Sequence, residues 1–183
     1  MSAGDRRFEP VDERTVFDGK IFRVTRERFR YPDGDVVERE VVRHRGAVAM
    51  VAHDATDLYL VRQPREAIGD PDFLEIPAGR LDQDGESPLE AAKRELAEEI
   101  GKRAEHWESL GSFYSSPGFA NEEVHLYLAT GISDADTVPE IEEDERIDVE
   151  VRPLSDLDAI LAETKDAKTL IALMRVKDRL TAG

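Results

Sequence analysis

The segment from Pro77 to Lys102 constrains the fold more than any other part of the chain. It combines a glycine-bearing loop, a clear helix start and a cluster of acids at helical spacing. Ser87 is followed at once by proline and, three positions on, by Glu90, which predicts a capping box with proline at the first helical position. Gly101 is placed to end the helix in the left-handed conformation. We therefore expect a helix over residues 88–100.

Two faces of this helix differ in chemistry. At about 100° per residue, one apolar stripe should pack on a core. It consists of Leu89, Ala92, Leu96 and Ile100. A second face, roughly 110° away, carries Glu95, Glu98 and Glu99, whose mutual repulsion a bound Mg²⁺ or Mn²⁺ would turn into attraction. The alternative is a solvated acidic face that pairs with Lys102 and Arg103.

Composition narrows the chemistry that such a helix can support. The 183 residues include no cysteine, which excludes disulfides and thiolate ligands and leaves oxygen donors and histidine. Any metal should therefore be a hard cation. The net charge of −16 argues against nucleic acid and anionic membranes as partners. An enzyme acting on phosphates would need divalent ions to bring an anionic substrate to an acidic site.

The hydrophobic fraction of 40% and charged fraction of 36% are ordinary for a globular domain, and the length fits one domain with a small appendage. No stretch approaches the roughly 18 apolar residues that span a bilayer. Residues 1–10 are polar and acidic, unlike a signal peptide. We therefore expect a cytoplasmic protein.

The remaining pattern predicts a mixed sheet interrupted by helices. Residues 1–15 lack periodicity and are expected to form a loose arm. Residues 17–42 indicate a hairpin, which must pack on the main body or on another subunit because two strands alone are marginal. Residues 157–176 have the spacing of an amphipathic helix. Further strands are expected at residues 47–51, 58–61, 73–76, 124–129 and 147–151, with an irregular stretch over 63–72.

The loop and helix resemble the Nudix box, G-x5-E-x7-R-E-U-x-E-E-x-G-U, where U is aliphatic. The matching positions are Gly79, Glu86, Arg94, Glu95, Leu96, Glu98, Glu99 and Gly101. The sequence departs from the pattern twice: six residues separate Gly79 from Glu86, and Lys102 replaces the last aliphatic residue. The extra residue lies in a loop, where lengthening costs little closure entropy and leaves the phase of the helix unchanged.

The resemblance implies a pyrophosphatase that depends on Mg²⁺, or alternatively on Mn²⁺. The implied metal ligands are Glu86, Glu95, Glu98, Glu99 and the carbonyl oxygen of Ala78. Among them Glu95 and Glu99 would bind the metal directly, whereas Glu86 would either bind it or anchor the loop. Arg94 would orient the glutamates, and Gly79 would lie against the substrate.

A second resemblance concerns the substrate. Pro117, within Ser115–Phe119, stands sixteen residues after Gly101 and resembles the marker of ADP-ribose pyrophosphatases. That family converts ADP-ribose to AMP and ribose 5-phosphate. The alternative is an ordinary Ser-Pro-Gly turn before a strand.

The acid-rich residues 140–145 lie where ADP-ribose pyrophosphatases carry a mobile loop with a catalytic glutamate. Glu143 fits that place best, and Glu142 or Glu145 would replace it if the register differed. The carboxylate would act as general base on the water that attacks one phosphorus. The alternative is an acidic loop that serves solubility.

Three further residues resemble substrate contacts of the same family. Arg65 lies where those enzymes place an arginine on the diphosphate or terminal ribose, which suits bidentate oxygen contacts. Arg39 and Glu40 resemble residues near the adenine, often from a neighbouring subunit, although an ordinary surface strand explains them equally well. Phe22 or Phe29 would stack on the base or belong to a core.

The resemblance implies an α/β/α sandwich with a mixed sheet over residues 46–183. Residues 1–45 would form an arm and a small antiparallel β-region that makes a homodimer. Rival substrates are another nucleotide sugar, NADH or a dinucleoside polyphosphate. A rival of another class is a non-catalytic sensor of ADP-ribose or a nucleotide, although a sensor would be free to lose Glu95, Glu98 or Glu99. A purely structural acidic domain is the third alternative.

Overall fold

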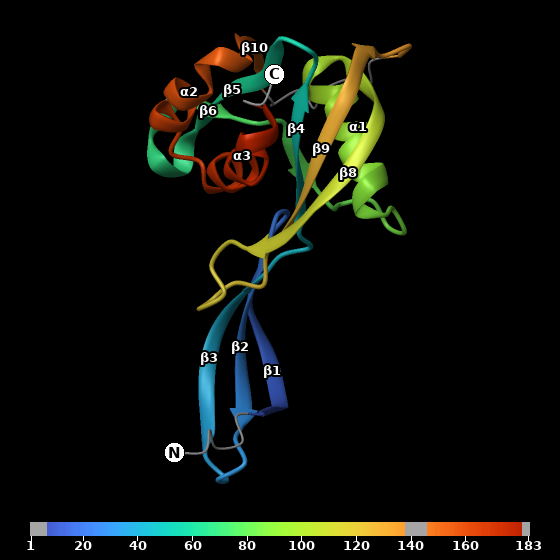
Figure 1. The fold of residues 1–183 in the computed structure, drawn as a ribbon. Coiled ribbons are helices and arrows are strands. Elements are labelled where there is room, and N and C mark those ends of the chain that lie inside the picture. Colours follow the sequence, from blue (N-terminus) through green and yellow to red (C-terminus); the bar gives the residue numbers. More distant parts are fainter. Residues whose placement is uncertain (1–6, 138–145, 181–183) are drawn as a thin grey trace. The chain divides into compact units, whose positions relative to one another are not determined.

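A computed structural model describes residues 7–137 and 146–180 (Figure 1). The chain divides into two compact units. One consists of residues 1–46 and 114–123, and the other of residues 47–113 and 124–183.

The first unit is built on a three-stranded antiparallel sheet in the order β1-β2-β3 (Figure 1). The strands are β1 (Glu9–Asp18), β2 (Arg23–Arg30) and β3 (Val36–Arg43). The expected hairpin corresponds to β2 and β3, and the predicted small antiparallel region is confirmed. Gly34 makes the turn between them with a φ of 94°.

The expectation of a loose N-terminal arm is wrong from Glu9 onward, because β1 pairs with β2 along its whole length. Every residue of β1 is exposed, so the strand has no buried apolar face that periodicity could reveal. Backbone pairing and ion pairs such as Arg28 with Asp12 hold it instead. Phe17 and Phe22 contact each other, with ring centroids 5.9 Å apart, as do Phe8 and Phe29 at 5.4 Å.

Residues 114–123 belong to the first unit because they bind the end of β3. The Val42 amide donates to the Phe119 carbonyl at 2.7 Å, and the Asn121 amide donates back to the Val42 carbonyl at 3.1 Å. The Asn121 side chain also accepts from the His44 amide at 2.7 Å. The loop that carries Pro117 is thereby fixed to the N-terminal sheet.

The second unit contains a mixed sheet in the order β10-β5-β4-β9-β8, with β6 paired to β5 and β7 to β4. The parallel pair is β4 with β9, whereas β5 is antiparallel to its neighbours. The strands are β4 (Ala47–His53), β5 (Asp57–Arg65), β6 (Asp70–Glu75), β7 (Ala78–Arg80), β8 (Lys102–Tyr114), β9 (Glu123–Asp134) and β10 (Asp148–Pro153). The helices are α1 (Pro88–Ile100), α2 (Leu157–Glu163) and α3 (Ala167–Leu180), with short 3-10 turns at Glu66–Ile68 and Leu154–Asp156.

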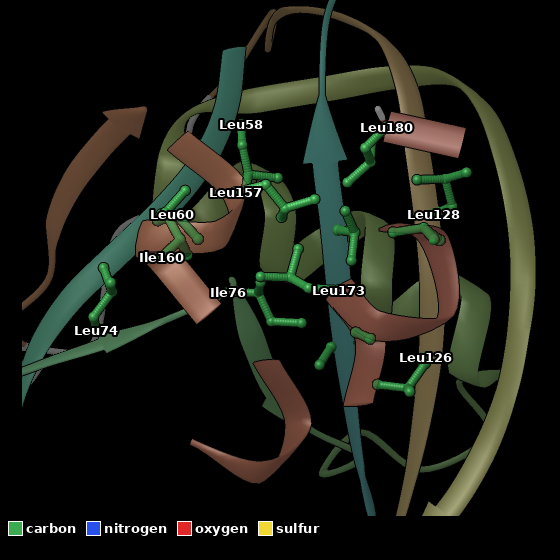
Figure 2. Close-up of a cluster of buried hydrophobic side chains, with 14 of the residues drawn as sticks. Leu58, Leu60, Leu74, Ile76, Leu126, Leu128, Leu157, Ile160, Leu173 and Leu180 are labelled. Carbon is green, nitrogen blue, oxygen red and sulfur yellow. The ribbon is translucent and has the colours of Figure 1, made fainter. Parts of the chain in front are cut away.

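Helices cover both faces of this sheet because side chains alternate along its buried central strand. Val48, Met50 and Ala52 of β4 belong to the apolar cluster that includes α1. Ala49 and Val51 belong to the cluster that includes α2 and α3 (Figure 2). The predicted α/β/α sandwich with a mixed sheet is confirmed. None of the helices in the described ranges is long and apolar enough to cross a membrane.

Candidate active site

The helix predicted from the capping pattern forms as expected and positions the acidic residues. The Ser87 hydroxyl accepts from the Glu90 amide, and the Glu90 carboxylate accepts from the Ser87 amide at 2.9 Å. Gly101 ends the helix with a φ of 64° and donates to the Ala97 carbonyl at 3.1 Å. The apolar stripe, with Leu96 fully buried, packs on β4, so the rotation of the helix is fixed.

Arg94 of α1 is the centre of the site, since its guanidinium binds three carboxylates. Its Nη1 donates to Glu95 and to Glu98, both at 2.7 Å. Its Nε and Nη2 donate to the two oxygens of Glu86, both at 3.1 Å. These groups are largely buried, the Glu86 and Glu95 side chains being 13% and 12% exposed. Arg94 therefore fixes the relative positions of all three glutamates.

The loop before α1, at residues 82–86, contains the extra residue that distinguishes this sequence from the motif. Gly85 adopts a φ of 86°, and the Glu86 amide donates to the Gln83 carbonyl at 3.3 Å, so the chain turns back toward the helix. Arg94 binds this loop through Asp82 at 3.5 Å as well as through Glu86. The longer spacing therefore still brings Glu86 to the arginine.

Two close contacts join the glycine loop to the acidic face. The Ala78 amide donates to Glu99 Oε2 at 2.8 Å, and Glu99 is 8% exposed. A Cβ placed on Gly79 would lie 1.8 Å from Cδ of Glu95. The carboxylate of Glu95 thus occupies the space that any side chain at position 79 would need. This explains why position 79 is a glycine.

The second departure from the motif also has a structural explanation. The Lys102 ammonium donates to Asp134 at 2.6 Å and lies 5.6 Å from the ring centroid of Tyr59. Its methylene chain can cover apolar surface as an aliphatic residue would, while the charge reaches solvent.

The electrostatics of the cluster are dominated by an excess of negative charge. Burial raises the pKa of Glu95 to about 7, and the charges of Glu98 and Asp82 add to that rise although Arg94 opposes it. Burial alone would lower the pKa of Arg94, but its carboxylate partners raise it. One guanidinium cannot neutralise all of these acids.

The donor set fits a hard divalent cation. Over residues 7–137 and 146–180, no three acidic or histidine groups converge as a ready metal site, and Glu95 and Glu98 both accept from Arg94. All the side-chain donors are carboxylate oxygens, and their charge exceeds that of the arginine. Mg²⁺ prefers such ligands and completes its shell with water and substrate phosphates.

Arg65, expected to contact substrate, is held by a buried carboxylate that the sequence analysis missed. Its Nε and Nη2 donate to the two oxygens of Glu75 at 2.5 and 2.8 Å, and Glu75 is 1% exposed. Lys168, at the start of α3, binds the same carboxylate. A single acid within the apolar run from Phe73 to Ile76 was the available signal.

The other predicted residues lie elsewhere. Arg39, Glu40 and Pro117 belong to the first unit. Arg39 donates to the Glu38 carbonyl at 2.9 Å, and Glu40 accepts from Arg26 at 3.0 Å. Pro117 lies in a turn closed by the Phe119 amide on the Ser116 carbonyl at 3.1 Å. The candidate bases Glu142, Glu143 and Glu145 lie outside the described residues.

The fold and the cluster define a class of α/β/α domain that presents a capped, carboxylate-rich helix beside a glycine loop. The family model described as "NUDIX domain" matches residues 42–174. The chain therefore belongs to the Nudix hydrolase family.

Individual relatives are consistent with this assignment. The chain is 37% identical to an ADP-ribose pyrophosphatase of Bacillus subtilis, over 94% of this chain and 95% of the relative. It is 38% identical to a methanol dehydrogenase activator of Bacillus methanolicus, over 86% of each chain. A crystal structure titled as an ADP compounds hydrolase has the same fold, with a TM-score of 0.81, 24% identity and coverage of 99% of this chain and 98% of that one.

Proposed function

We propose that this protein hydrolyses the diphosphate of ADP-ribose to AMP and ribose 5-phosphate, with Mg²⁺ or Mn²⁺ as cofactor. The observation that carries the proposal is the cluster around Arg94, in which Glu86, Glu95 and Glu98 share one guanidinium. The similarity to an ADP-ribose pyrophosphatase along nearly the whole chain supports the choice of substrate.

In this proposal the glutamates of α1 hold the cation. Glu95 and Glu99 would bind it directly, the carbonyl of Ala78 would add an oxygen, and Glu86 and Glu98 would be further carboxylate ligands. A divalent ion at such a site polarises phosphoryl oxygens and lowers the pKa of bound water. Arg94 keeps the carboxylates aligned before the ion arrives. Glu99 fixes the Ala78 amide, which orients the glycine loop against the helix.

The acids beyond Asp134 provide the proposed general base. Glu143 is the first choice, and Glu142 and Glu145 are the alternatives. Its carboxylate would take the proton from the attacking water. Gly79 and Arg65 would line the diphosphate, and Arg39, Glu40 and Pro117 would contact the nucleoside part.

We also propose that residues 1–45 form a dimerising region and residues 46–183 the catalytic domain. Phe17, Ile21 and Phe22 of the N-terminal region are 53%, 56% and 41% exposed, which is unusual for large apolar side chains on a small sheet. A homodimer would cover them. Light scattering after size exclusion tests this directly, and a monomer at micromolar concentration would contradict it.

A substrate panel tests the proposed activity. ADP-ribose, ADP-glucose, GDP-mannose, NADH and diadenosine polyphosphates are incubated with Mg²⁺, and the nucleotide and the second phosphorylated product released from each compound are measured, with EDTA as control. NADH belongs in the panel because one relative is named as the activator of a dehydrogenase. Fast, EDTA-sensitive turnover of ADP-ribose above the others is expected. Metal-dependent turnover of another compound would replace the substrate, and binding without turnover would favour a sensor.

A further inference from the structure

The second unit contains another buried ion cluster, formed by Glu75, Arg65 and Lys168. Its carboxylate lies on the same side of the sheet as α1. Glu75 pairs in register with Val61 across β5 and β6, and paired residues of neighbouring strands point to the same face. Val61 belongs to the apolar cluster of α1. The neighbours Leu74 and Ile76 instead join the opposite cluster (Figure 2). Glu75 is therefore a buried acid on the face that carries the candidate active site.

This acid is bound by two cations from distant parts of the chain. Arg65, at the end of β5, makes two parallel hydrogen bonds to it at 2.5 and 2.8 Å. Lys168 binds it from the first turn of α3 and also pairs with Asp166 at 3.0 Å. A bidentate pair of this kind fixes the plane of a guanidinium, which a single contact does not. Arg65 is therefore held in one orientation.

Arg65 is accessible to solvent, although its partners Glu75 and Lys168 are much less exposed. Its side chain is 42% exposed, against 1% for Glu75 and 17% for Lys168. The hydrogen bonds that Arg65 donates to Glu75 raise the pKa of Arg65 against the opposing effect of burial, and the charge of Glu99 raises it further. Arg65 is thus a fixed cation with an exposed edge, within the electrostatic influence of a proposed metal ligand.

We propose that Glu75 is a positioning residue that, together with Lys168, holds Arg65 ready to bind the substrate diphosphate. This inference rests on the proposed function only in taking a diphosphate as the ligand. Lys168, itself also paired with Asp166, shares the carboxylate of Glu75 with Arg65, so the charge of Glu75 is not directed at the arginine alone. A guanidinium fixed before binding loses less conformational entropy when the ligand arrives.

The backbone around Glu75 explains how the cluster keeps its place. The Ile76 amide donates to the Thr169 hydroxyl at 2.9 Å, and the Thr164 hydroxyl donates to the Leu74 carbonyl at 2.9 Å. Both flanking residues of Glu75 are thus tied to the segment that carries Lys168. The carboxylate and the ammonium are fixed by the same contacts.

The test measures affinity for a diphosphate that cannot be hydrolysed. Isothermal titration with α,β-methylene-ADP and Mg²⁺ is performed on wild type, Arg65→Ala, Glu75→Gln and the double variant. Arg65→Ala and Glu75→Gln should each weaken binding roughly tenfold, as expected for a charged hydrogen-bonded contact. The double variant should be no weaker than Arg65→Ala, because Glu75 acts through Arg65. If the double variant lost a further tenfold in affinity relative to Arg65→Ala, the two effects would be independent and the proposal would be overturned.

Two more variants keep the test decisive if Glu75→Gln does not fold. Arg65→Lys keeps the charge but loses the bidentate geometry, and should still weaken binding of α,β-methylene-ADP several-fold. Glu150→Gln is the matched control. Glu150 also binds arginines, namely Arg62, which lies on β5 like Arg65, and Arg152, but it does so outside the proposed site. The affinity of this variant should equal that of wild type. Wild-type affinity in Arg65→Lys, or no binding of the probe by wild type, would contradict the inference.

The kinetic readout separates positioning from a structural role. For whichever substrate the wild type hydrolyses, Glu75→Gln should raise KM with little change in kcat, whereas loss of folded protein would lower kcat alone. If the wild type binds α,β-methylene-ADP but does not hydrolyse ADP-ribose, the proposed function fails and the positioning role is still decided by the titrations.

Discussion

The two buried ion clusters of the second unit differ in their balance of charge. Around Arg94 one cation serves Glu86, Glu95 and Glu98. Around Glu75 two cations share the carboxylate, and one of them, Lys168, also binds Asp166. The first cluster has unneutralised negative charge and suits an added cation. The second presents an exposed guanidinium and suits an added anion. A substrate diphosphate with its metal ion would satisfy both, so the difference indicates how one face accommodates opposite charges.

The largest expected effect comes from the acidic cluster. Glu99→Gln should lower kcat by roughly 10³-fold, because it removes a charge from the proposed metal site while an amide oxygen can still accept from Ala78. Steady-state kinetics with Mg²⁺, beside a thermal melt, provide the measurement. Wild-type turnover in a folded variant would end the assignment of Glu99 as a ligand.

The two clusters should respond oppositely to pH. The pKa of Glu95 is raised from 4.5 to about 7, so its contribution to stability is present below pH 4.5 and is lost as pH rises through 7. The loss amounts to about 3 kcal/mol in metal-free protein. Urea unfolding in EDTA at about pH 5 and about pH 8 measures it, and Glu95→Gln should abolish it.

Glu75 supplies the opposite sign in the same experiment. Burial would raise its pKa, but Arg65 and Lys168 outweigh burial and lower it. Its contribution is therefore present above the ordinary value of 4.5 and is lost as pH falls through the lowered value. Glu75→Gln should destabilise the protein at neutral pH and much less in acid. The same pH dependence in both variants would remove the contrast between the clusters.

A steric change sharpens the comparison without altering charge. Gly79→Ala places a Cβ where the Glu95 carboxylate lies, so that carboxylate must move. A displacement of about 1 Å can reduce turnover about 10²-fold. We expect that loss in kcat, together with weaker binding of α,β-methylene-ADP, because Gly79 is proposed to line the diphosphate. A matched substitution, Gly118→Ala, meets open space and should change neither.

The smallest effect is expected for an exposed ion pair. Lys102→Leu restores the aliphatic residue of the motif and removes a bond to Asp134, whose side chain is 88% exposed. The free energy of unfolding should change by less than about 1 kcal/mol, with activity retained. A larger loss would mean that pairs outside the two clusters also support the site.

The extent to which the sequence predicted the structure depended on how local the signal was. The helix α1 was predicted to its bounds because Ser87, Glu90 and Gly101 act within a few residues of it. The strands β1 and β8 were missed, since each is polar along much of its length and lies at the edge of its sheet. Edge strands need no apolar alternation.

The candidate site followed the same rule. The motif identified Arg94 and its glutamates, because they lie on one helix and its preceding loop. The pairing of Glu75 with Lys168 joins positions 93 apart in the sequence. Glu75 stands out as a single acid in an apolar run, but no pattern indicates Lys168 as its partner. The hydrogen bonds that Thr164 and Thr169 make with the residues on either side of Glu75 bring them together.

The hydrogen bonds that Thr164 and Thr169 make with the residues beside Glu75 affect when the proposed diphosphate contact can form during synthesis. The helix with the acidic residues has left the ribosome long before residue 168 is added. Until then Glu75 lacks Lys168, and the amide of Ile76 lacks the hydroxyl of Thr169. A nascent chain that ends near residue 160 therefore has helix α1 but not the second cation on the buried acid. Completion of the proposed diphosphate contact is thereby delayed until residue 168 has been added.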